Sequence, residues 1–526
     1  MTQHSPSTAR LWALFATGMC LALLAVGRDR MMRDPGTLWH TVVGEDILTS
    51  GHITDTDRFS FTHAGKPWLA QQWLGECIMA LVHRAAGLDG LLLMACAVLA
   101  ATYASIATRL HRLGQPVFHA VFITLVIIAA SSFHFMPRPH LATIAFTALT
   151  FAILVDVEAG RASARRLWLL PIIIAVWSNI HGGALGGVAM IGIVCGGWIA
   201  LALTRRRTLP APIARVALIV ALSFAATLAN PFGPRLPKLW IDLMSMKSLP
   251  GTIVEHAPLQ PASFEGIMIL VLGIAYAAAC FRARKVGLRV TWAIPIVWFV
   301  LGLMRIRHAP LFAVTAAIAL ADILMRTGLV TSVRIGYVKV RTEGDKLHRS
   351  GGEGGMDAAF VGYDRRPSSR RLSPWHAAPI ALIAVVFTLQ ANRIQFPLVG
   401  AGWARLSPAN WPVSATEVLR DELKIPGANG RVFNVLNYGG YLIYKLPDAR
   451  IYIDDRCELY EEAGLADYLD LMRNPARFDE VAQKFDISAA LIRSRSRLAD
   501  HLDKSPQWTR RHQDDLAAVY VRNPAR

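Results

Sequence analysis

The stretch Arg33–His40, RDPGTLWH, brings an acid and an imidazole into one short segment. Asp34 precedes Pro35, so its carboxylate can accept free backbone N–H groups at a helix start, where proline is well tolerated. A carboxylate can equally take the proton of an attacking hydroxyl group. Asp34 is therefore a candidate helix cap and a candidate catalytic base. His40 and Asp57, in the turn GHITDTDRFSFT, are candidates to complete such a site.

A second set of side chains could bind an anion. It consists of cations and imidazoles in short polar segments between apolar runs, namely Arg138, His140, His181, Arg235, Arg305, Arg307 and His308. Arginine forms bidentate contacts with phosphate oxygens. Any single residue could instead extend toward lipid headgroups. Taken together, the set predicts one shared phosphate or diphosphate ligand.

The composition indicates what positions these residues. The chain has 526 residues, of which 53% are hydrophobic and 17% charged, and its mean hydropathy is +0.37. Soluble domains carry about 25% charged residues. We therefore predict a polytopic α-helical membrane protein. The net charge of +18 falls largely in short loops, so membrane orientation explains it better than nucleic acid, which we exclude as a partner.

About eleven apolar segments are long enough to be predicted as spans. They lie near 11–27, 86–108, 115–133, 139–156, 166–180, 183–203, 211–229, 264–281, 290–304, 308–325 and 375–391. Alternate loops are basic, which predicts that they and the N-terminus are cytoplasmic. The opposite loops, with 28–85 and everything after 391, would then be extracytoplasmic. Ala25–Gly27 weakly resembles a signal cleavage site, but retention of the first span is favoured.

This topology divides the chain into four parts. Residues 1–325 form a transmembrane core with external loop 28–85, 326–374 a flexible cytoplasmic linker, 375–391 the last span, and 405–526 an external α/β domain. ISAALIR and AAVYVR are typical of strands. In the first loop, Trp39, Val43 and Ile47 fall on one helix face, which predicts a helix lying on the membrane surface. Cys77 and Cys457 are expected to be exposed.

The first span also limits where Asp34 can lie. About seven extended residues reach at most ~25 Å, so Asp34 stays near the membrane surface, where a phosphate carried by a lipid would sit.

Several motifs, in their order and spacing, resemble the GT-C superfamily of membrane glycosyltransferases, and in particular a poorly characterised bacterial group within it. They span nearly the whole chain and are Asp34-Pro35-Gly36, Trp39-His40, GHITDTDRFSFT, PWLAQQWLGE, RPH, WSNIHGG, NPFG, YGGYLIY and IYIDDRCELY. The resemblance implies a multi-span fold in a bacterial inner membrane, a polyprenyl-phosphate sugar donor and an external α/β domain. It also implies an essential aspartate in the first external loop, which is Asp34 here.

The sequence departs from that pattern at Gly36, because many members of the superfamily carry a second acid there. Metal dependence is therefore open: no cofactor is assigned, and a divalent metal stays compatible with the site. The cysteines show no spacing typical of zinc.

The resulting hypothesis is an inverting glycosyltransferase in which Asp34 is the general base and the arginines stabilise the leaving phosphate. Glu255, in TIVEHAP, and Glu76 are candidates to bind the sugar or the acceptor, which could be a glycan, a lipid or a protein. Asp454, Asp455 and Arg456 are interpreted as a local ion-paired turn. Two alternatives stay open. One is a transporter or flippase of lipid-linked sugars, and the other is a non-catalytic envelope assembly protein.

Overall fold

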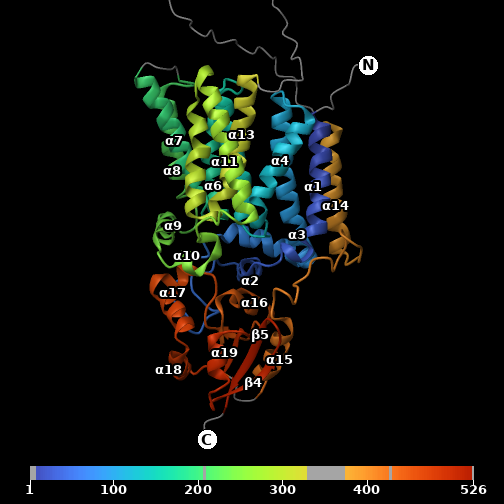
Figure 1. Ribbon diagram of the computed structural model, residues 1–526, viewed down its shortest axis with the longest axis vertical. Coiled ribbons are helices and arrows are strands. Elements are labelled where there is room, and N and C mark those ends of the chain that lie inside the picture. The colour runs from blue at the N-terminus through green and yellow to red at the C-terminus, as the bar shows by residue number, and fades with distance from the viewer. Residues whose placement is uncertain (1–7, 205–208, 329–372, 426–428, 524–526) are drawn as a thin grey trace, which may run out of the picture.

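The computed structural model describes residues 8–204, 209–328, 373–425 and 429–523. It consists of a bundle of long helices and, at one end of that bundle, a smaller α/β domain formed by the C-terminal residues (Figure 1). The predicted linker 326–374 lies almost entirely outside the described residues, as do Arg205, Arg206 and Arg207. The short segments between bundle and domain carry the site described below.

All eleven predicted spans are helical in the described part of the chain. Eight helices are long and apolar enough to cross a membrane: Thr8–Arg30 (α1), Trp73–Arg112 (α3), Val117–His134 (α4 and a short 3-10 turn), His140–Glu158 (α5), Ala184–Leu203 (α7), Phe264–Val286 (α11 and a 3-10 turn), Ile306–Thr327 (a 3-10 turn and α13) and Pro374–Ala391 (a 3-10 turn and α14). The remaining three predicted segments form shorter helices, Leu169–Ile180 (α6), Ile213–Ala226 (α8) and Val290–Met304 (a 3-10 turn and α12).

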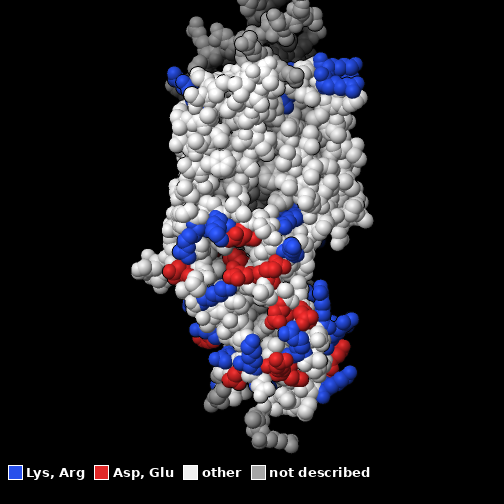
Figure 2. Space-filling model, turned by 90° about the vertical axis from the view of Figure 1, so that its left-hand side faces the viewer, with Lys and Arg blue, Asp and Glu red and all other residues white. Residues whose placement is uncertain are grey.

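The bundle has the surface expected of a protein surrounded by lipid. Its helices expose many large apolar side chains, among them Phe118, Phe122, Ile172, Leu203 and Ile274. Figure 2 shows a wide band of this face without charged side chains, between Lys and Arg at one end and mixed charges around the C-terminal domain. Inside the bundle, α13 is buried from Ala309 to Ile323, and its many alanines let neighbouring helices approach closely. The chain is a multi-span helical membrane protein.

The basic loops meet at the end of the bundle far from the C-terminal domain. Arg109 contacts Asp156 at 2.7 Å, Arg161 bridges Asp156 and Asp322, and Arg289 contacts Asp322 at 2.7 Å. Asp322 is 0% exposed, and its buried carboxylate charge is balanced by two arginines. The prediction that these loops share one end is confirmed. The side of the membrane on which they lie stays a prediction.

Helix α3 covers two segments of the sequence, the PWLAQQWLGE region of the first loop and the span predicted near 86–108. It is interrupted at Gly87, whose φ of 61° and ψ of −149° are readily adopted only by glycine. The part before Gly87 lies under the bundle beside Pro35–Ser50 (α2), and the part after it enters the bundle (Figure 1). The span predicted to begin at residue 86 therefore begins at this kink.

The C-terminal domain is built on a five-stranded mixed sheet in the order β2-β1-β3-β5-β4. The strands are Arg431–Asn434 (β1), Arg450–Ile451 (β2), Ala489–Arg493 (β3), Trp508–Gln513 (β4) and Ala517–Arg522 (β5), and the helices are Val413–Leu423 (α15), Leu436–Lys445 (α16), Cys457–Arg473 (α17), Phe478–Lys484 (α18) and Arg497–Leu502 (α19). β1 pairs in parallel with β2 and β3, and β5 pairs antiparallel with β3 and β4. The predicted strands ISAALIR and AAVYVR contain β3 and β5.

The first loop packs into the C-terminal domain rather than on a lipid surface. Trp39, Val43 and Ile47 are buried in the hydrophobic core that also contains β1, β3 and α16. Ser60 forms a parallel bridge with Ile451, so the loop extends the edge of the sheet beyond β2. The surface helix predicted at Trp39 is therefore wrong in its environment, because the apolar face is covered by protein.

Candidate active site between the bundle and the C-terminal domain

A cavity of about 350 Å³ lies where the bundle, the first loop and the C-terminal domain meet. This volume is within the range of ~300–1,000 Å³ typical of small-molecule sites. Six of the predicted site residues line it: Arg138, His140, His181, Glu255, Arg307 and His308. These residues come from four separate turns at the ends of helices, and only the folded bundle brings them together.

Asp34 does not itself line this cavity, but its carboxylate pairs with Arg138, which does. The Asp34 carboxylate accepts the backbone N–H of Gly36 at 2.7 Å, which caps α2, and accepts Arg138 Nη1 at 2.9 Å. Asp34 is buried, and burial is the main cause that raises its pKa, against the opposing effect of Arg138. The structure thus gives Asp34 the cap predicted from the sequence and also a charged partner that lines the cavity.

Gly36 leaves the space in which Arg138 packs. A Cβ at this position would lie 2.7 Å from Arg138 Nε and 2.7 Å from Asp34 Oδ1. A second acid at position 36 would displace the guanidinium group. Gly36 therefore lets Arg138 lie directly against the start of α2.

Glu255 is the second carboxylate beside Arg138. Its Oε1 lies 3.5 Å from Arg138 Nη1 and 3.7 Å from His134 Nδ1. Burial opposes ionisation of Glu255, but Arg138 and neighbouring cations outweigh it and hold its pKa below the usual value. Arg138 contacts both Asp34 and Glu255 through Nη1, and its Nη2 has no hydrogen bond to any other described residue. That nitrogen is a donor available to a ligand.

The histidines differ in what they can donate. His181 Nδ1 accepts the Gly183 N–H at 3.0 Å and contacts the Thr143 hydroxyl at 2.8 Å. Burial, followed by Arg307, lowers the pKa of His181 well below its usual value, so the ring is neutral and carries its hydrogen on Nε2. His140 instead uses Nε2 on the carbonyl of His134 at 2.8 Å. A neutral His140 therefore has no N–H left for a phosphate, whereas His181 has one.

Arg307 and Arg305 hold one imidazole between them. Arg307 Nη1 contacts His256 Nε2, and Arg305 Nη1 lies 3.3 Å from His256 Nδ1. Burial and the adjacent Arg307 lower the pKa of His256 to about 2. The His256 ring is therefore neutral and adds no third positive charge between the two guanidinium groups. Arg305 also donates to the Met244 carbonyl at 3.0 Å and does not line the cavity, whereas Arg307 does.

The other predicted site residues do not line the cavity. Arg235 is exposed at the start of Arg235–Ser245 (α9). His40 and Glu76 are buried and paired with each other at 2.8 Å, where α2 crosses α3. Burial, then Arg138, lowers the pKa of His40. Their mutual contact satisfies one polar atom on each side chain and gives both a structural role that the sequence did not indicate.

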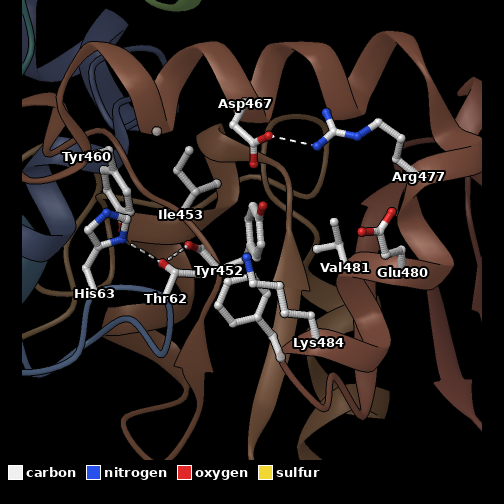
Figure 3. A pocket seen from close by; sticks show the side chains of 12 residues that line it. Thr62, His63, Tyr452, Ile453, Tyr460, Asp467, Arg477, Glu480, Val481 and Lys484 are labelled. Carbon is white, nitrogen blue, oxygen red and sulfur yellow. Dashed lines mark hydrogen bonds and ion pairs between the residues drawn. The ribbon is translucent and has the colours of Figure 1, made fainter.

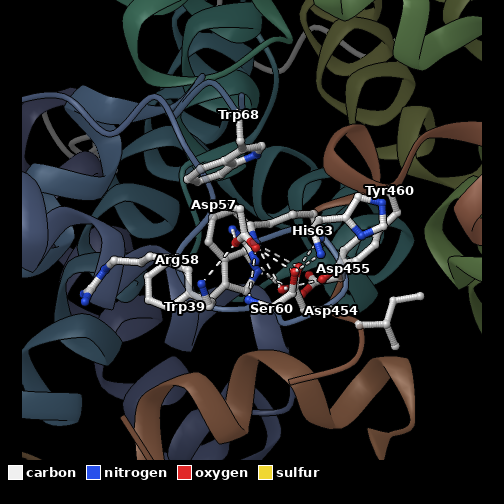
Figure 4. Close-up of polar contacts among 12 residues, drawn as sticks. Trp39, Asp57, Arg58, Ser60, His63, Trp68, Asp454, Asp455 and Tyr460 are labelled. Atoms are coloured by element: carbon white, nitrogen blue, oxygen red, sulfur yellow. Dashed lines mark hydrogen bonds and ion pairs between the residues drawn. The ribbon is translucent and has the colours of Figure 1, made fainter. Parts of the chain in front are cut away.

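Asp57 also has a structural environment (Figure 4). Its carboxylate accepts the Ser60 hydroxyl at 2.6 Å and the Ser60 N–H at 3.0 Å, and it forms an ion pair with Arg456 at 2.8 Å. Arg456 is 0% exposed, pairs with Asp454 at 2.6 Å and lies over the Trp68 ring. The predicted ion-paired turn is thus confirmed for Asp454 and Arg456, but it also ties the first loop to the C-terminal domain.

The C-terminal domain contributes acids that the sequence did not indicate as site residues, and Asp455 is not part of the ion-paired turn predicted for it. Asp455, Cys457 and Glu458 line the cavity, and Asp455 accepts the Trp39 indole N–H at 2.8 Å. Glu458 accepts the Trp68 indole N–H at 3.0 Å. Cys77 and Cys457 are both buried, which contradicts their expected exposure, because the first loop and α17 cover each other. The motif IYIDDRCELY contains these acids and could have indicated them. Adjacent acids and an arginine, however, most often form a local ion pair, so the motif alone did not predict a site.

Asp455 should make stability depend on pH. Burial is the main cause that raises its pKa to about 8, and Asp34 adds to the shift. Its pKa in the unfolded chain is about 4. The protonated form is therefore favoured by folding, so this contribution to stability is fully present below pH ~4 and is lost as the pH rises toward ~8. Asp455→Asn should remove that loss, and the gain in melting temperature over wild type should grow between pH 5 and 8.

The matched control is Asp421→Asn on α15, which removes a carboxylate that is 79% exposed. Thermal unfolding of each purified protein, measured across the pH series, provides the comparison. A pH-independent difference between Asp455→Asn and wild type would mean that Asp455 is ionised throughout.

The far part of the cavity is apolar. It runs past Leu185, Gly186, Trp298, Leu301 and Leu311, at the ends of α7, α12 and α13 that face the C-terminal domain. One cavity therefore offers cationic donors and carboxylates at one part and a hydrocarbon-like lining at another. Among the described residues, no three His, Cys, Asp or Glu side chains are grouped to hold a metal ion, and Arg138 supplies the positive charge beside Asp34.

Comparison with known proteins gives a structural likeness over the full chain. No family model matches the sequence, and no curated protein sequence matches it. Among solved structures, ArnT from Cupriavidus metallidurans bound to undecaprenyl phosphate is similar, with a TM-score of 0.50 and 13% sequence identity. The similarity covers 98% of this chain and 98% of that chain. The protein is thus a multi-span helical membrane protein with a C-terminal α/β domain and an ArnT-like fold.

Proposed function

We propose that this protein is a glycosyltransferase that moves a sugar from a polyprenyl-phosphate donor to an acceptor hydroxyl, with inversion at the anomeric carbon. The observation that carries the proposal is the cavity in which Arg138, Arg307 and His181 face an apolar channel beside the Asp34 carboxylate. The ArnT-like fold supports a lipid-phosphate ligand, because that protein was solved with undecaprenyl phosphate.

In this mechanism the donor phosphate contacts Arg307, Arg138 Nη2 and His181 Nε2, and the prenyl chain lies against the apolar lining. The acceptor oxygen attacks the anomeric carbon as the bond from that carbon to the phosphate oxygen breaks. Asp34 takes the hydroxyl proton, and its raised pKa makes it a stronger base than an exposed aspartate. The phosphate leaves with the bonding electrons, and the arginines stabilise its added charge.

Asp455 and Glu255 complete the polar part of the site. With a pKa of about 8, Asp455 is largely protonated near neutral pH and can donate a hydrogen bond to a sugar hydroxyl. Glu255, whose pKa is held low, is ionised and can accept one. The two carboxyl groups thus offer opposite hydrogen-bonding roles to one sugar ring.

The same proposal assigns a membrane orientation. The end that carries Arg109, Arg161 and Arg289 would face the cytoplasm of a bacterial inner membrane, because Lys and Arg are enriched on that side. The cavity and the C-terminal domain would then be extracytoplasmic. The acceptor would be a glycan, a lipid or a protein on that side.

A transfer assay in proteoliposomes tests the reaction. Purified protein is given polyprenyl phosphate carrying a radiolabelled sugar and a membrane extract as acceptor source. Transfer of label to a non-prenyl product supports the proposal. Movement of intact labelled lipid between leaflets, without chemical change, would instead identify a flippase. If the protein neither transferred nor moved the labelled lipid, and cells lacking the C-terminal domain had an envelope defect, the protein would be identified as an assembly protein.

Arg307→Met should weaken binding of the lipid phosphate by about 10- to 100-fold, because a charge-assisted hydrogen bond contributes ~1.5–3 kcal/mol. Titration of undecaprenyl phosphate can be followed by tryptophan fluorescence, since Trp39, Trp240 and Trp298 line the cavity. Arg305→Met is the matched control, because Arg305 is close in the chain and does not line the cavity. Equal weakening in both variants would place the phosphate elsewhere.

A further inference from the structure

A second, smaller pocket of about 170 Å³ lies between the first loop and the C-terminal domain (Figure 3). Its volume is below the ~300–1,000 Å³ of sites for drug-sized ligands, which leaves room for one small ring. Thr62 and His63 of the first loop form one side, and α17 and α18 form the others. None of its residues was singled out as a site residue from the sequence, and the catalytic proposal does not use them.

Aromatic rings form the walls of this pocket. Tyr460 and His63 meet edge to face with ring centres 4.9 Å apart, and Tyr452 and Phe485 do so at 6.3 Å. These contacts hold the rings in place, so the pocket is pre-formed. Flat apolar rings can pack against the C–H groups of a sugar while leaving its hydroxyls free at the edge.

The polar groups of the pocket suit a ligand with many hydroxyls. Tyr452 is only 6% exposed, and its hydroxyl, which Figure 3 shows among the lining side chains, has no hydrogen bond to any other described residue. A hydroxyl that lacks a protein partner can both donate to and accept from a ligand in the pocket. Glu480 and Lys484 line the same pocket and offer an acceptor and a donor.

The charges of the pocket argue against an anionic ligand. Asp467 and Glu480 balance Arg477 and Lys484, and Arg477 is already paired with Asp467 at 3.0 Å and with Asp470. A phosphate would meet carboxylates as well as cations, whereas a neutral sugar can use both as hydrogen-bond partners.

The pocket neighbours the catalytic cavity. Ile453 and Tyr460 line the pocket, while Asp455 and Cys457, which lie between them in the chain, line the cavity. Ile453 and Asp455 are two residues apart, so their Cα atoms are at most ~7 Å from each other. The pocket and the cavity therefore adjoin the same short segment of the chain.

We propose that this pocket binds a neutral sugar ring of the acceptor, one or more units away from the hydroxyl that is glycosylated. The inference rests on the proposed glycosyl transfer and deepens it, because it assigns the acceptor to the carbohydrates. Tyr452 and Glu480 hydrogen-bond the ring hydroxyls, and Tyr460 and Phe485 pack against its C–H groups. The pocket acts as an acceptor subsite and takes no part in the chemical step.

Binding can be measured without catalysis. The purified full chain in detergent is tested by saturation-transfer NMR with methyl glycosides of glucose, galactose, mannose and arabinose, and with inorganic phosphate as a competitor. We expect binding of at least one glycoside, unaffected by phosphate. The double variant Tyr452→Phe with Glu480→Gln should bind it about 30-fold more weakly, since two hydrogen bonds of ~1 kcal/mol each are lost. Glu417→Gln, at an exposed position of α15, is the matched control.

The outcomes separate this inference from the proposed function. Asp34→Asn should keep glycoside binding, since Asp34 does not line the pocket. Sugar transfer by wild type without binding of any glycoside would overturn the acceptor subsite alone. Glycoside binding without transfer would overturn the transferase alone. Displacement of the glycoside by phosphate, or equal binding by the double variant at unchanged melting temperature, would also overturn the subsite.

Discussion

Replacing Asp34 by asparagine is expected to lower the turnover number of sugar transfer by about 10²- to 10⁴-fold, the usual contribution of a general base. Asparagine has nearly the same shape and caps helices as well as aspartate, so the bond to the Gly36 N–H can persist. Its carbonyl can still accept Arg138. The amide cannot take a proton from the acceptor, so the loss should fall on turnover and leave affinity for the donor lipid nearly unchanged.

The control for this prediction is Asp55→Asn. Asp55 is in the same loop but exposed, and its loss should leave transfer unchanged. Donor affinity is measured by the fluorescence titration and turnover by release of polyprenyl phosphate. Full activity of a folded Asp34→Asn protein would remove Asp34 from the chemical step and leave it as a helix cap.

Arg456→Met is expected to destabilise the contact between the first loop and the C-terminal domain by ~3–5 kcal/mol, because it leaves buried carboxylates without their cation. Arg456 contacts both Asp57 and Asp454, and all three side chains are 0% exposed. The melting temperature should fall, and limited proteolysis should cut the first loop. The cavity depends on this contact, since Trp39 and Asp455 line it from opposite sides of the junction.

A triple variant separates charge from packing. Arg456→Met combined with Asp57→Asn and Asp454→Asn removes the uncompensated charges, and it should recover much of the lost stability because neutral replacements of buried ion networks are often tolerated. Arg510→Met is the control: Arg510 pairs with Asp503 at 2.9 Å but is 44% exposed, so its loss should cost under ~1 kcal/mol. If Arg456→Met melts like wild type, the network is not what joins the two parts.

The sequence predicted the helical bundle well because each span is a local property. Apolar runs that are long enough to cross a membrane form helices whatever their neighbours are, since backbone groups in lipid must bond within the segment. The gathering of the basic loops at one end follows from a similarly local signal, the alternation of basic and non-basic loops between the spans. The strands β3 and β5 were recognisable for the same reason, because their apolar residues run without interruption.

The candidate site was predictable only in part. Arg138, Arg307, His181 and Glu255 stood out because charges at the ends of apolar segments are unusual, and all four line the cavity. In the sequence, Asp57, His40 and Glu76 were equally good candidates for a catalytic or binding role. Their partners, Arg456 for Asp57 and each other for His40 and Glu76, come from distant segments, so the sequence could not distinguish a catalytic carboxylate from one buried in an ion pair.

The sequence by itself determined the number and order of the apolar helices, the end of the bundle at which the basic loops gather, and the position of Asp34 beside the first span. Only the tertiary structure decided that the first loop packs into the C-terminal domain, that Gly36 makes room for Arg138, and that Asp455 lines the cavity. The physical reason is the range of the interactions. Hydrophobicity and helix formation act between near neighbours in the chain, whereas ion pairing and burial depend on residues that only folding brings together.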